Sequence, residues 1–407
     1  MRRRISAVAL VLAAVFALAA PAGASLRHRL DRALVAPGVS SDSTGALVFD
    51  LKRSSFVYRH HGSLSLRPAS NEKLPVTVTL LQRLGAGFRI PTQVLGQGNF
   101  TPDGIWHGRL VLKGYGNPAL KGSGLARLAQ SIRAAGILKV TGSIIGDESY
   151  FDSVRVGPGW KASYYKEESP PLSALVVNRA RIDGHISSNP ARAAAVLFKR
   201  ALRDAGVVVP GKAVKDKAAA DAVLLAELAS PRASRLIRHM DRVSDNFYAE
   251  MLLKQLGARF KDSGSTAAGA RVVRTALRQH GVTMTGVRIA DGSGLSAYDR
   301  LTPRAVIELL IWAVSDDAIR PPFVASLPVA GVSGTLEDRM TRPPAYRHVY
   351  AKTGTTDRAS ALSGYATNTK FSPRYVFSVL MNGNPIPWWY AREAQDRFAQ
   401  VLAGAAQ

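Results

Sequence analysis

The sequence predicts a mixed α/β (α+β) protein in which a smaller α+β subdomain is inserted into a larger domain. Thr44 to Leu51 and Ser54 to Arg59 alternate like the two strands of a hairpin. Ser360 to Thr367 and Tyr375 to Asn382 also have the pattern of strands, near the other end of the chain. From Phe88 to about Asn178 the chain changes to short strands, glycine-rich turns and a single good helix. This change of character indicates the insertion.

The N-terminus has the order of residues that is typical of a secretory signal. Three arginines at positions 2–4 precede an apolar run from Ile5 to Ala20, and the small residues Ala22 and Ala24 follow. We therefore expect residues 1–24 to be removed before Ser25, with an uncleaved membrane anchor as the alternative. The protein is expected to be exported, to the periplasm or the extracytoplasmic cell wall.

The remaining chain of about 380 residues is too long for one ordinary core. We assign residues 25–87 and 188–407 to the larger domain and residues 88–187 to the inserted subdomain. Helical spacing of apolar residues predicts helices over 26–34, from Ser70 to near Gly85, and over 125–135, 191–205, 247–256, 267–280, 303–314 and 391–402. Further strands are expected at 223–229 and 348–350.

Composition excludes several kinds of chemistry. The chain has no cysteine, so neither a thiol nucleophile nor a thiolate metal site is possible. Its eight histidines show no metal-ligand spacing, so we expect no metal and no cofactor. The formal net charge is +25, and it falls to +22 when the three signal arginines are removed. Export and the absence of a recognised motif argue against nucleic acid. An anionic cell wall or membrane surface fits this charge, as does a role in solubility alone.

The first chemical motif is Ser70-Asn71-Glu72-Lys73. A serine followed three residues later by lysine on a helix places a hydroxyl and an amine on one face. A neutral amine there can take the proton of an attacking serine. Taken alone, the motif is more often a helix cap followed by a solvated lysine. Pro75 lacks an N–H, so we expect a disturbed first helical turn.

Two further motifs follow in the second half of the chain. Ser244-Asp245-Asn246 presents a hydroxyl and a carboxamide ahead of a helix, although Asn246 alone would be read as a helix cap. Lys352-Thr353-Gly354-Thr355 enters from a strand. It would place an ammonium and a hydroxyl along one side of a cleft, and Gly354 would let a substrate backbone come close.

Ser-x-x-Lys, Ser-x-Asn and Lys-Thr-Gly in this order form the motif set of serine β-lactamases and penicillin-binding proteins. The chain resembles the class C low-molecular-mass penicillin-binding proteins, the D-alanyl-D-alanine carboxypeptidase/endopeptidases of peptidase family S13. Further segments carry this resemblance: 114–118, 146–151, 159–160, 244–250, 291–296, 327–331 and 334–336. The resemblance implies an antiparallel sheet between helices, joined to an all-helical lobe.

The resemblance also implies a role for each motif residue. Ser70 would attack the carbonyl between two D-alanines, Lys73 would be its general base, and Ser244 would pass the proton to the leaving amine. Asn246 would hold the substrate amide and Lys352 would supply positive potential. Thr353 and Thr355 would bind the terminal carboxylate, and the backbone N–H groups of Ser70 and Thr355 would form the oxyanion hole. The partners so implied are peptidoglycan stem peptides and, as covalent inhibitors, β-lactam antibiotics.

Two positions depart from the family pattern. Longer members carry a third domain between the segments that match 175–178 and 191–205, where this chain has only a dozen or so residues. In members that read a diaminopimelate side chain, an aspartate that matches Asp147 holds the distal amine and an arginine holds the carboxylate. That arginine is replaced here by Ala297, and Arg300 is the nearby candidate to take its place.

Two other functions remain open on the sequence. A serine β-lactamase would need a positioned base for fast deacylation, and the loop glutamates Glu167 and Glu168 are the candidates. A non-catalytic wall-binding protein on the same fold would be expected to lack Ser70, Lys73 or Lys352, all of which are present.

Overall fold

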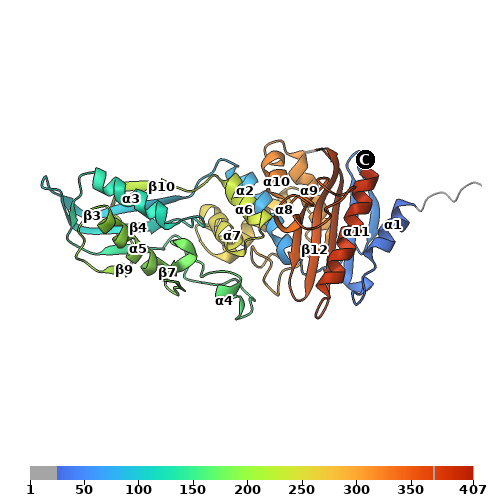
Figure 1. Cartoon of the computed structure of the whole chain (residues 1–407), viewed down its shortest axis with the longest axis horizontal. Coiled ribbons are helices and arrows are strands. Elements are labelled where there is room, and N and C mark those ends of the chain that lie inside the picture. Colours follow the sequence, from blue (N-terminus) through green and yellow to red (C-terminus); the bar gives the residue numbers. More distant parts are fainter. Residues whose placement is uncertain (1–24, 370–371, 407) are drawn as a thin grey trace, which may run out of the picture.

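A computed structural model describes residues 25–369 and 372–406. The predicted signal, residues 1–24, lies outside the described residues. Figure 1 shows an elongated molecule with a β-sheet near each end and helices α2, α6 and α7 between them. In the part of the chain that the structure describes, no helix combines the length and the apolar character that a membrane span requires.

The larger domain is organised around an antiparallel sheet. Within the described residues, five of its strands follow the spatial order β11-β12-β13-β1-β2. They are β1 (Thr44–Asp50), β2 (Ser55–His60), β11 (Val349–Thr355), β12 (Ala359–Thr369) and β13 (Ser372–Asn382). The strand patterns of the two chain ends therefore belong to one sheet. The segment 328–330 pairs with the start of β11, since the Ala330 amide donates to the Val349 carbonyl at 2.9 Å and the Ala351 amide donates to the Pro328 carbonyl at 3.0 Å. Among the described residues, the edge that remains for an extended ligand is therefore the end of β11 at Thr353–Thr355.

Helices cover both faces of this sheet. On one face, α1 (Leu26–Leu34) and α11 (Trp388–Ala406) pack together and share one apolar core with the strands. On the other face, α9 (Pro303–Ser315) contacts β1 and β13. Beyond it lies a helical lobe: α2 (Lys73–Leu84), α6 (Ala233–Arg242), α7 (Asn246–Lys261), α8 (Thr266–Gln279) and α10 (Arg320–Ser326). This arrangement is the sheet between helices with a helical lobe that the family resemblance implied.

The start of α2 differs from a plain helix. Ala69–Glu72 forms a 3-10 turn, and the α-helix begins only at Lys73. Pro75 explains this, because it cannot donate to the carbonyl of Asn71. Leu74 and Val78 are fully buried. Burying such a side chain contributes roughly 1.5–3 kcal/mol, which anchors the helix despite the irregular turn.

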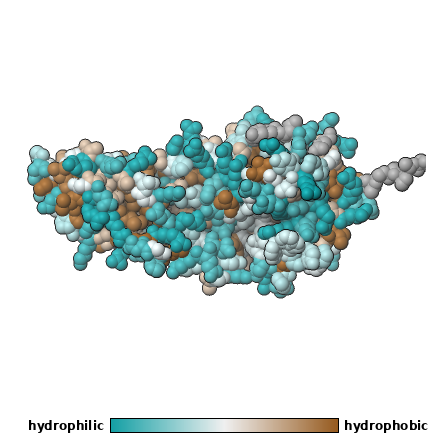
Figure 2. Space-filling model, in the orientation of Figure 1, coloured by the Kyte–Doolittle hydropathy of each residue, from teal (hydrophilic) through white to brown (hydrophobic). Residues whose placement is uncertain are grey.

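The inserted subdomain has its own sheet, with the order β10-β3-β4-β6-β9. Its strands are β3 (Pro91–Phe100), β4 (Ile105–Gly114), β6 (Ile144–Asp147), β9 (Ala213–Lys215) and β10 (Val223–Ala229), and the short β5 (Lys139–Val140) pairs with β4. Helices α3 (Gly122–Ala134) and α5 (Pro190–Asp204) pack on it over an apolar core. Figure 2 shows apolar groups among hydrophilic ones at this end of the molecule.

The expected end of the insert at residue 187 is therefore too early. Helix α5 and strands β9 and β10 complete the second sheet, so the insert runs to about Ala229. Where longer members of the family that the chain resembles carry a third domain, this chain forms a short hairpin, β7 (Arg181–Ile182) and β8 (His185–Ile186). The remaining short elements are α4 (Tyr164–Glu167) and the 3-10 turns Ser41–Ser43, Asn178–Ala180 and Gly334–Leu336.

The two connections between insert and larger domain lie side by side. The amide of Ala233 donates to the carbonyl of Phe88 at 2.7 Å, and the amide of Ile90 donates to the Ser230 hydroxyl at 2.9 Å. The chain therefore leaves the larger domain and returns to it at one point, as an insertion requires.

Candidate active site

The turn that carries Ser70 is fixed against the edge strand β11. The Asn71 amide group donates to the backbone carbonyl of Lys352 at 3.0 Å. A Cβ atom on Gly354 would lie 2.9 Å from both the Pro68 carbonyl oxygen and the Ser70 nitrogen. Only glycine lets the strand come so close to the turn. The Ser70 amide therefore lies beside the strand that carries Thr355.

Lys73 joins the first two motifs. Its amine lies 2.9 Å from Ser70 Oγ, 2.8 Å from Asn246 Oδ1 and 2.7 Å from the carbonyl oxygen of Ser293. The carbonyl oxygens of Asn246 and Ser293 can only accept hydrogen bonds. A neutral amine would give its two hydrogens to them, and its lone pair would then face the Ser70 hydroxyl. This is the geometry that a general base for Ser70 needs.

The surroundings of Lys73 favour that neutral form. The side chain is fully buried, and burial lowers its pKa from the ordinary 10.5 to about 8. The carboxyl groups of Asp291, Asp245, Glu250 and Asp241 act in the opposite direction. Desolvation is the larger effect, so a useful fraction of the amine is neutral near pH 7.

Lys352 forms the matching contact with the second motif. Its amine donates to Ser244 Oγ and to the carbonyl oxygen of Thr353, both at 2.9 Å. Burial and the nearby charge of Lys73 lower its pKa to about 7. Ser244 has a φ of 59°, a strained conformation for a serine, which places its hydroxyl between the helical lobe and β11. Two lysine–serine pairs thus face each other across one site.

The carboxamide of Asn246 is held at both ends. Its oxygen accepts from Lys73, while its nitrogen donates to the backbone oxygen of Glu168 at 3.3 Å and to Glu168 Oε2 at 3.2 Å. Both Glu168 partners are acceptors, so the amide orientation is determined. Glu168 comes from the insert, which therefore contributes to the site.

These groups line a cavity of about 630 Å³. Ser70, Ser244 and Asn246 lie along it with the segment 353–357 of β11 and its following turn, and insert residues 161–168 form part of the opposite wall. A 2.6 Å ion pair between Lys161 and Asp357 joins these two sides. The cavity therefore lies between the larger domain and the insert, next to the Thr353–Thr355 end of β11.

One end of the cavity carries cations that sequence reasoning missed. The Arg392 guanidinium donates to Thr355 Oγ1 at 3.2 Å, and Arg339 also lines the cavity. The Thr353 hydroxyl donates to Thr335 Oγ1 at 2.7 Å. Thr335 lies in the segment 334–336 that supports the resemblance. Nothing in the sequence singled out Arg392, because it belongs to the last helix and reaches β11 only in the folded protein.

Comparisons with known proteins show which family the chain belongs to. A family model described as D-Ala-D-Ala carboxypeptidase 3 (S13) family matches residues 26–189 and 183–404. The chain belongs to this family. Among S13-like relatives, the D-alanyl-D-alanine carboxypeptidase of Actinomadura sp. (strain R39) is 30% identical over 481 residues, which cover 97% of this chain and 88% of that protein.

Solved structures show the same fold. The crystal structure of penicillin-binding protein 4 from Haemophilus influenzae superposes with a TM-score of 0.81 at 22% identity, covering 93% of this chain and 98% of that one. A structure of that protein complexed with a β-lactam gives a TM-score of 0.74 at the same identity and coverage. The S13 architecture is thus kept over nearly the whole chain.

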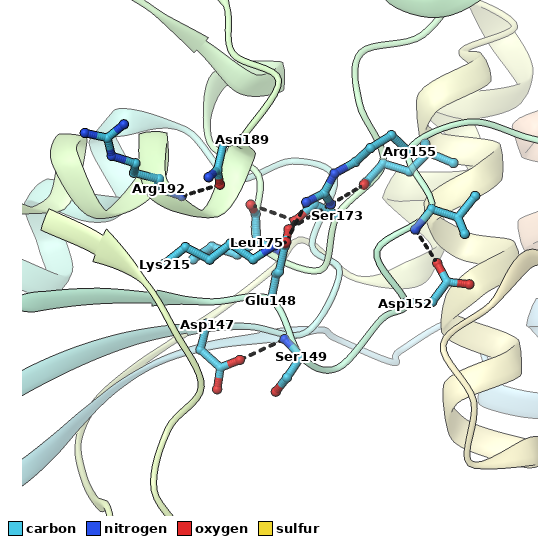
Figure 3. Close-up of polar contacts among 12 residues, drawn as sticks. Asp147, Glu148, Ser149, Asp152, Arg155, Ser173, Leu175, Asn189, Arg192 and Lys215 are labelled. Atoms are coloured by element: carbon cyan, nitrogen blue, oxygen red, sulfur yellow. Dashed lines mark hydrogen bonds and ion pairs between the residues drawn. The ribbon is translucent and has the colours of Figure 1, made fainter.

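Asp147 does not lie where the S13 resemblance led us to expect it. Its carboxylate is buried in the insert, accepts from the amides of Ser149 at 2.8 Å and Ala218 at 3.0 Å, and lies 3.7 Å from Lys113. Figure 3 shows it directed towards Ser149 and away from the contacts between Glu148 and Arg155. It is not among the residues that line the cavity. A buried carboxylate with these partners serves the insert's own structure, so the assignment of Asp147 to substrate binding is corrected.

The position of Ala297 leaves the expected S13 arginine unreplaced. Arg300 donates to the carbonyl oxygens of Ala297 at 2.9 Å and Asp299 at 2.6 Å. It is not among the cavity residues. Its guanidinium is therefore used within its own loop.

Glycine is required where that loop passes the nucleophile. Gly294 has a φ of 84°, and a Cβ there would lie 1.8 Å from the Ala69 carbonyl oxygen. Asp291 organises the loop by accepting from the amides of Gly294 at 2.7 Å and Ser296 at 2.8 Å, and from Trp160 Nε1 at 2.7 Å. This loop carries the Ser293 carbonyl, so it positions Lys73 as well.

Proposed function

We propose that this protein is a serine-type D-Ala-D-Ala carboxypeptidase and DD-endopeptidase that trims peptidoglycan stem peptides and is acylated by β-lactams. Membership of the S13 family and the carboxypeptidase names of its relatives support this function. The observation that carries it is the contact of Lys73 with Ser70, in which the other two acceptors leave the amine's lone pair facing the hydroxyl. That arrangement makes a nucleophile without any metal or cofactor.

In the proposed reaction, Ser70 Oγ attacks the carbonyl carbon of the D-Ala-D-Ala bond and its proton moves to Lys73. The amides of Ser70 and Thr355 stabilise the oxyanion. The carbon–nitrogen bond then breaks, and the leaving nitrogen receives a proton through Ser244, which contacts Lys352. Water hydrolyses the resulting ester, which restores the Ser70 hydroxyl and releases the shortened peptide.

The cationic end of the cavity fits the terminal carboxylate of the substrate. Thr353 and Thr355 line it, and Arg392 already contacts the Thr355 hydroxyl. Charge-assisted hydrogen bonds from these groups would fix the leaving D-alanine in place. The peptide backbone would approach β11 beside Thr355, and Asn246 would hold the amide on the acyl side.

Two observations bear on the alternatives. Glu168 lies at the cavity beside Asn246, so a deacylating role in a β-lactamase has one candidate group. A non-catalytic scaffold is disfavoured because Ser70, Lys73, Ser244 and Lys352 are all present and in contact. We place the action of the enzyme outside the cytoplasm, where its substrate occurs, and expect the N-terminal segment to direct export.

Labelling with benzylpenicillin tests this function. The purified protein is incubated with benzylpenicillin and followed by intact-mass spectrometry, alongside release of D-alanine from a peptide that ends in D-Ala-D-Ala. We expect a persistent adduct and D-alanine release, both absent in Ser70→Ala and unchanged in the exposed control Ser63→Ala. Rapid turnover of the antibiotic without D-alanine release would identify a β-lactamase, and the absence of any adduct would identify a scaffold.

A further inference from the structure

A second hollow lies on the insert, away from the active site. It has a volume of about 1170 Å³ and is formed between α5 and the segment 206–215, which ends in β9. Figure 1 shows α5 and β9 in the part of the molecule remote from α11 and β12. The catalytic motifs do not contribute to it. We call it the insert groove.

The insert groove is basic. Six of its lining residues are lysine or arginine and none is acidic: Arg192, Lys199, Arg200, Arg203, Lys212 and Lys215. Arg200 and Arg203 pair with Asp183 and Asp204, and Lys215 lies 2.5 Å from Glu148. Figure 3 shows the Lys215 side chain extending towards Glu148. Within residues 25–369 and 372–406, no carboxylate pairs with Arg192 or Lys212. These two cations are therefore available to an anionic ligand.

Other parts of the groove are apolar. Val196, Val209 and Val214 line it and are partly exposed, and Val208 is 60% exposed. Phosphate groups or a purely polar polymer would have no apolar groups to pack against these valines. Its composition fits a ligand in which negative groups alternate with short apolar ones.

The groove also offers a free strand edge. β9 is the last strand of the insert sheet and, among the described strands, pairs only with β6. Alternate backbone groups of an edge strand point away from the sheet and can pair with an extended peptide. Lysines at such an edge oppose its pairing with strands of other protein molecules. A peptide that carries carboxylates would instead be attracted by their charge.

We propose that the insert groove binds a stem peptide of peptidoglycan and holds the polymer while another stem is cleaved. This inference rests on the proposed function, which supplies a substrate that is extended, carries carboxylates and has the methyl side chains of alanine. Carboxylates would meet Arg192 and Lys212, methyl groups would meet the valines, and backbone amides would meet β9. A tethered polymer presents its other stems to the active site at a raised effective concentration.

Co-sedimentation with purified, insoluble peptidoglycan tests the groove apart from catalysis. The protein is first acylated with benzylpenicillin, so that the active site is filled. We compare wild type with Arg192→Glu/Lys212→Glu and with Val208→Trp, which fills the groove without changing the charge. The matched control is Lys121→Glu/Arg127→Glu, at the exposed residue that precedes α3 and at an exposed position within that helix, in the same insert. Thermal unfolding confirms that each variant is folded.

We expect both groove variants to lose at least tenfold in binding while the control keeps wild-type binding. All variants should release D-alanine from a small soluble peptide at the wild-type rate. Equal binding by wild type and groove variants, or an equal loss in the control, would overturn the proposal. So would groove-dependent sedimentation with anionic phosphatidylglycerol vesicles in place of peptidoglycan. A wild type that sediments but does not cleave the soluble peptide would refute the proposed function and leave the groove supported.

Discussion

The rate of acylation should depend steeply on pH, because the proposed base must be neutral to accept the Ser70 proton. Burial lowers the pKa of Lys73 to about 8, so the neutral fraction is about one tenth at pH 7 and about one thousandth at pH 5. If all other steps are unaffected, acylation falls about a hundredfold between these values. Above about pH 8 the neutral fraction of Lys73 rises little further, while Lys352, whose pKa is lowered to about 7, loses the charge that supplies positive potential, so we expect the rate to pass through a maximum. The sign follows from the base: activity is lost as the pH falls.

The measurement is the second-order rate constant of acylation by benzylpenicillin between pH 5 and 9, from quenched samples and intact-mass spectrometry. The variant Asp241→Asn tests whether nearby charge sets the pKa of Lys73. The charge of Asp241 raises the pKa of both Lys73 and Lys352, while its carboxylate accepts from Thr77 and Ser326. Its neutral isostere should therefore move the profile to lower pH. A profile that is flat from pH 5 to 9, or that moves to higher pH in Asp241→Asn, would refute this account.

Three further changes have expected outcomes. Ser70→Ala should abolish the penicillin adduct and change stability by about a kcal/mol at most, because it removes one hydroxyl from a turn; mass spectrometry and thermal unfolding measure both. Gly294→Ala should slow acylation at least tenfold, because the new Cβ must displace the Ala69 carbonyl; Gly184→Ala, with a φ of 82° and open space around it, controls for backbone strain alone. Arg392→Ala should raise KM for peptides with a free terminal carboxylate more than for their amides, and equal effects on the two substrates would exclude a carboxylate contact.

The parts of the site that could be predicted from the sequence are those whose residues lie in short motifs, close together along the chain. Ser70 and Lys73 are three residues apart, so their contact follows from helical geometry once the turn forms. The contact of Lys352 with Ser244 joins residues 108 apart, and the order of motifs in the resemblance supplied it. The strands of the larger sheet could also be predicted, because apolar and polar residues alternate along them or because they are strongly apolar.

The parts that could not be predicted depend on tertiary packing. Arg392 and Glu168 reach the cavity from a terminal helix and from an irregular loop, and no spacing in the sequence connects either to Ser70. The end of the insert was misplaced because the apolar face of α5 has the same pattern whichever sheet it covers. Asp147 was assigned by motif alone, and only the fold shows that its side chain faces Ser149 and Ala218.

The adjacent connections of the insert have a consequence for how such a protein could be divided. Because the chain leaves at Phe88 and returns at Ala233 through paired backbone, a short linker could in principle replace everything between without unravelling the larger sheet. The loop with Lys161 and Glu168 makes that excision costly in another way: the shortened enzyme would keep Ser70 and Lys73 but lose one wall of its cavity. The larger domain could therefore fold without the insert, but its active site would be incomplete.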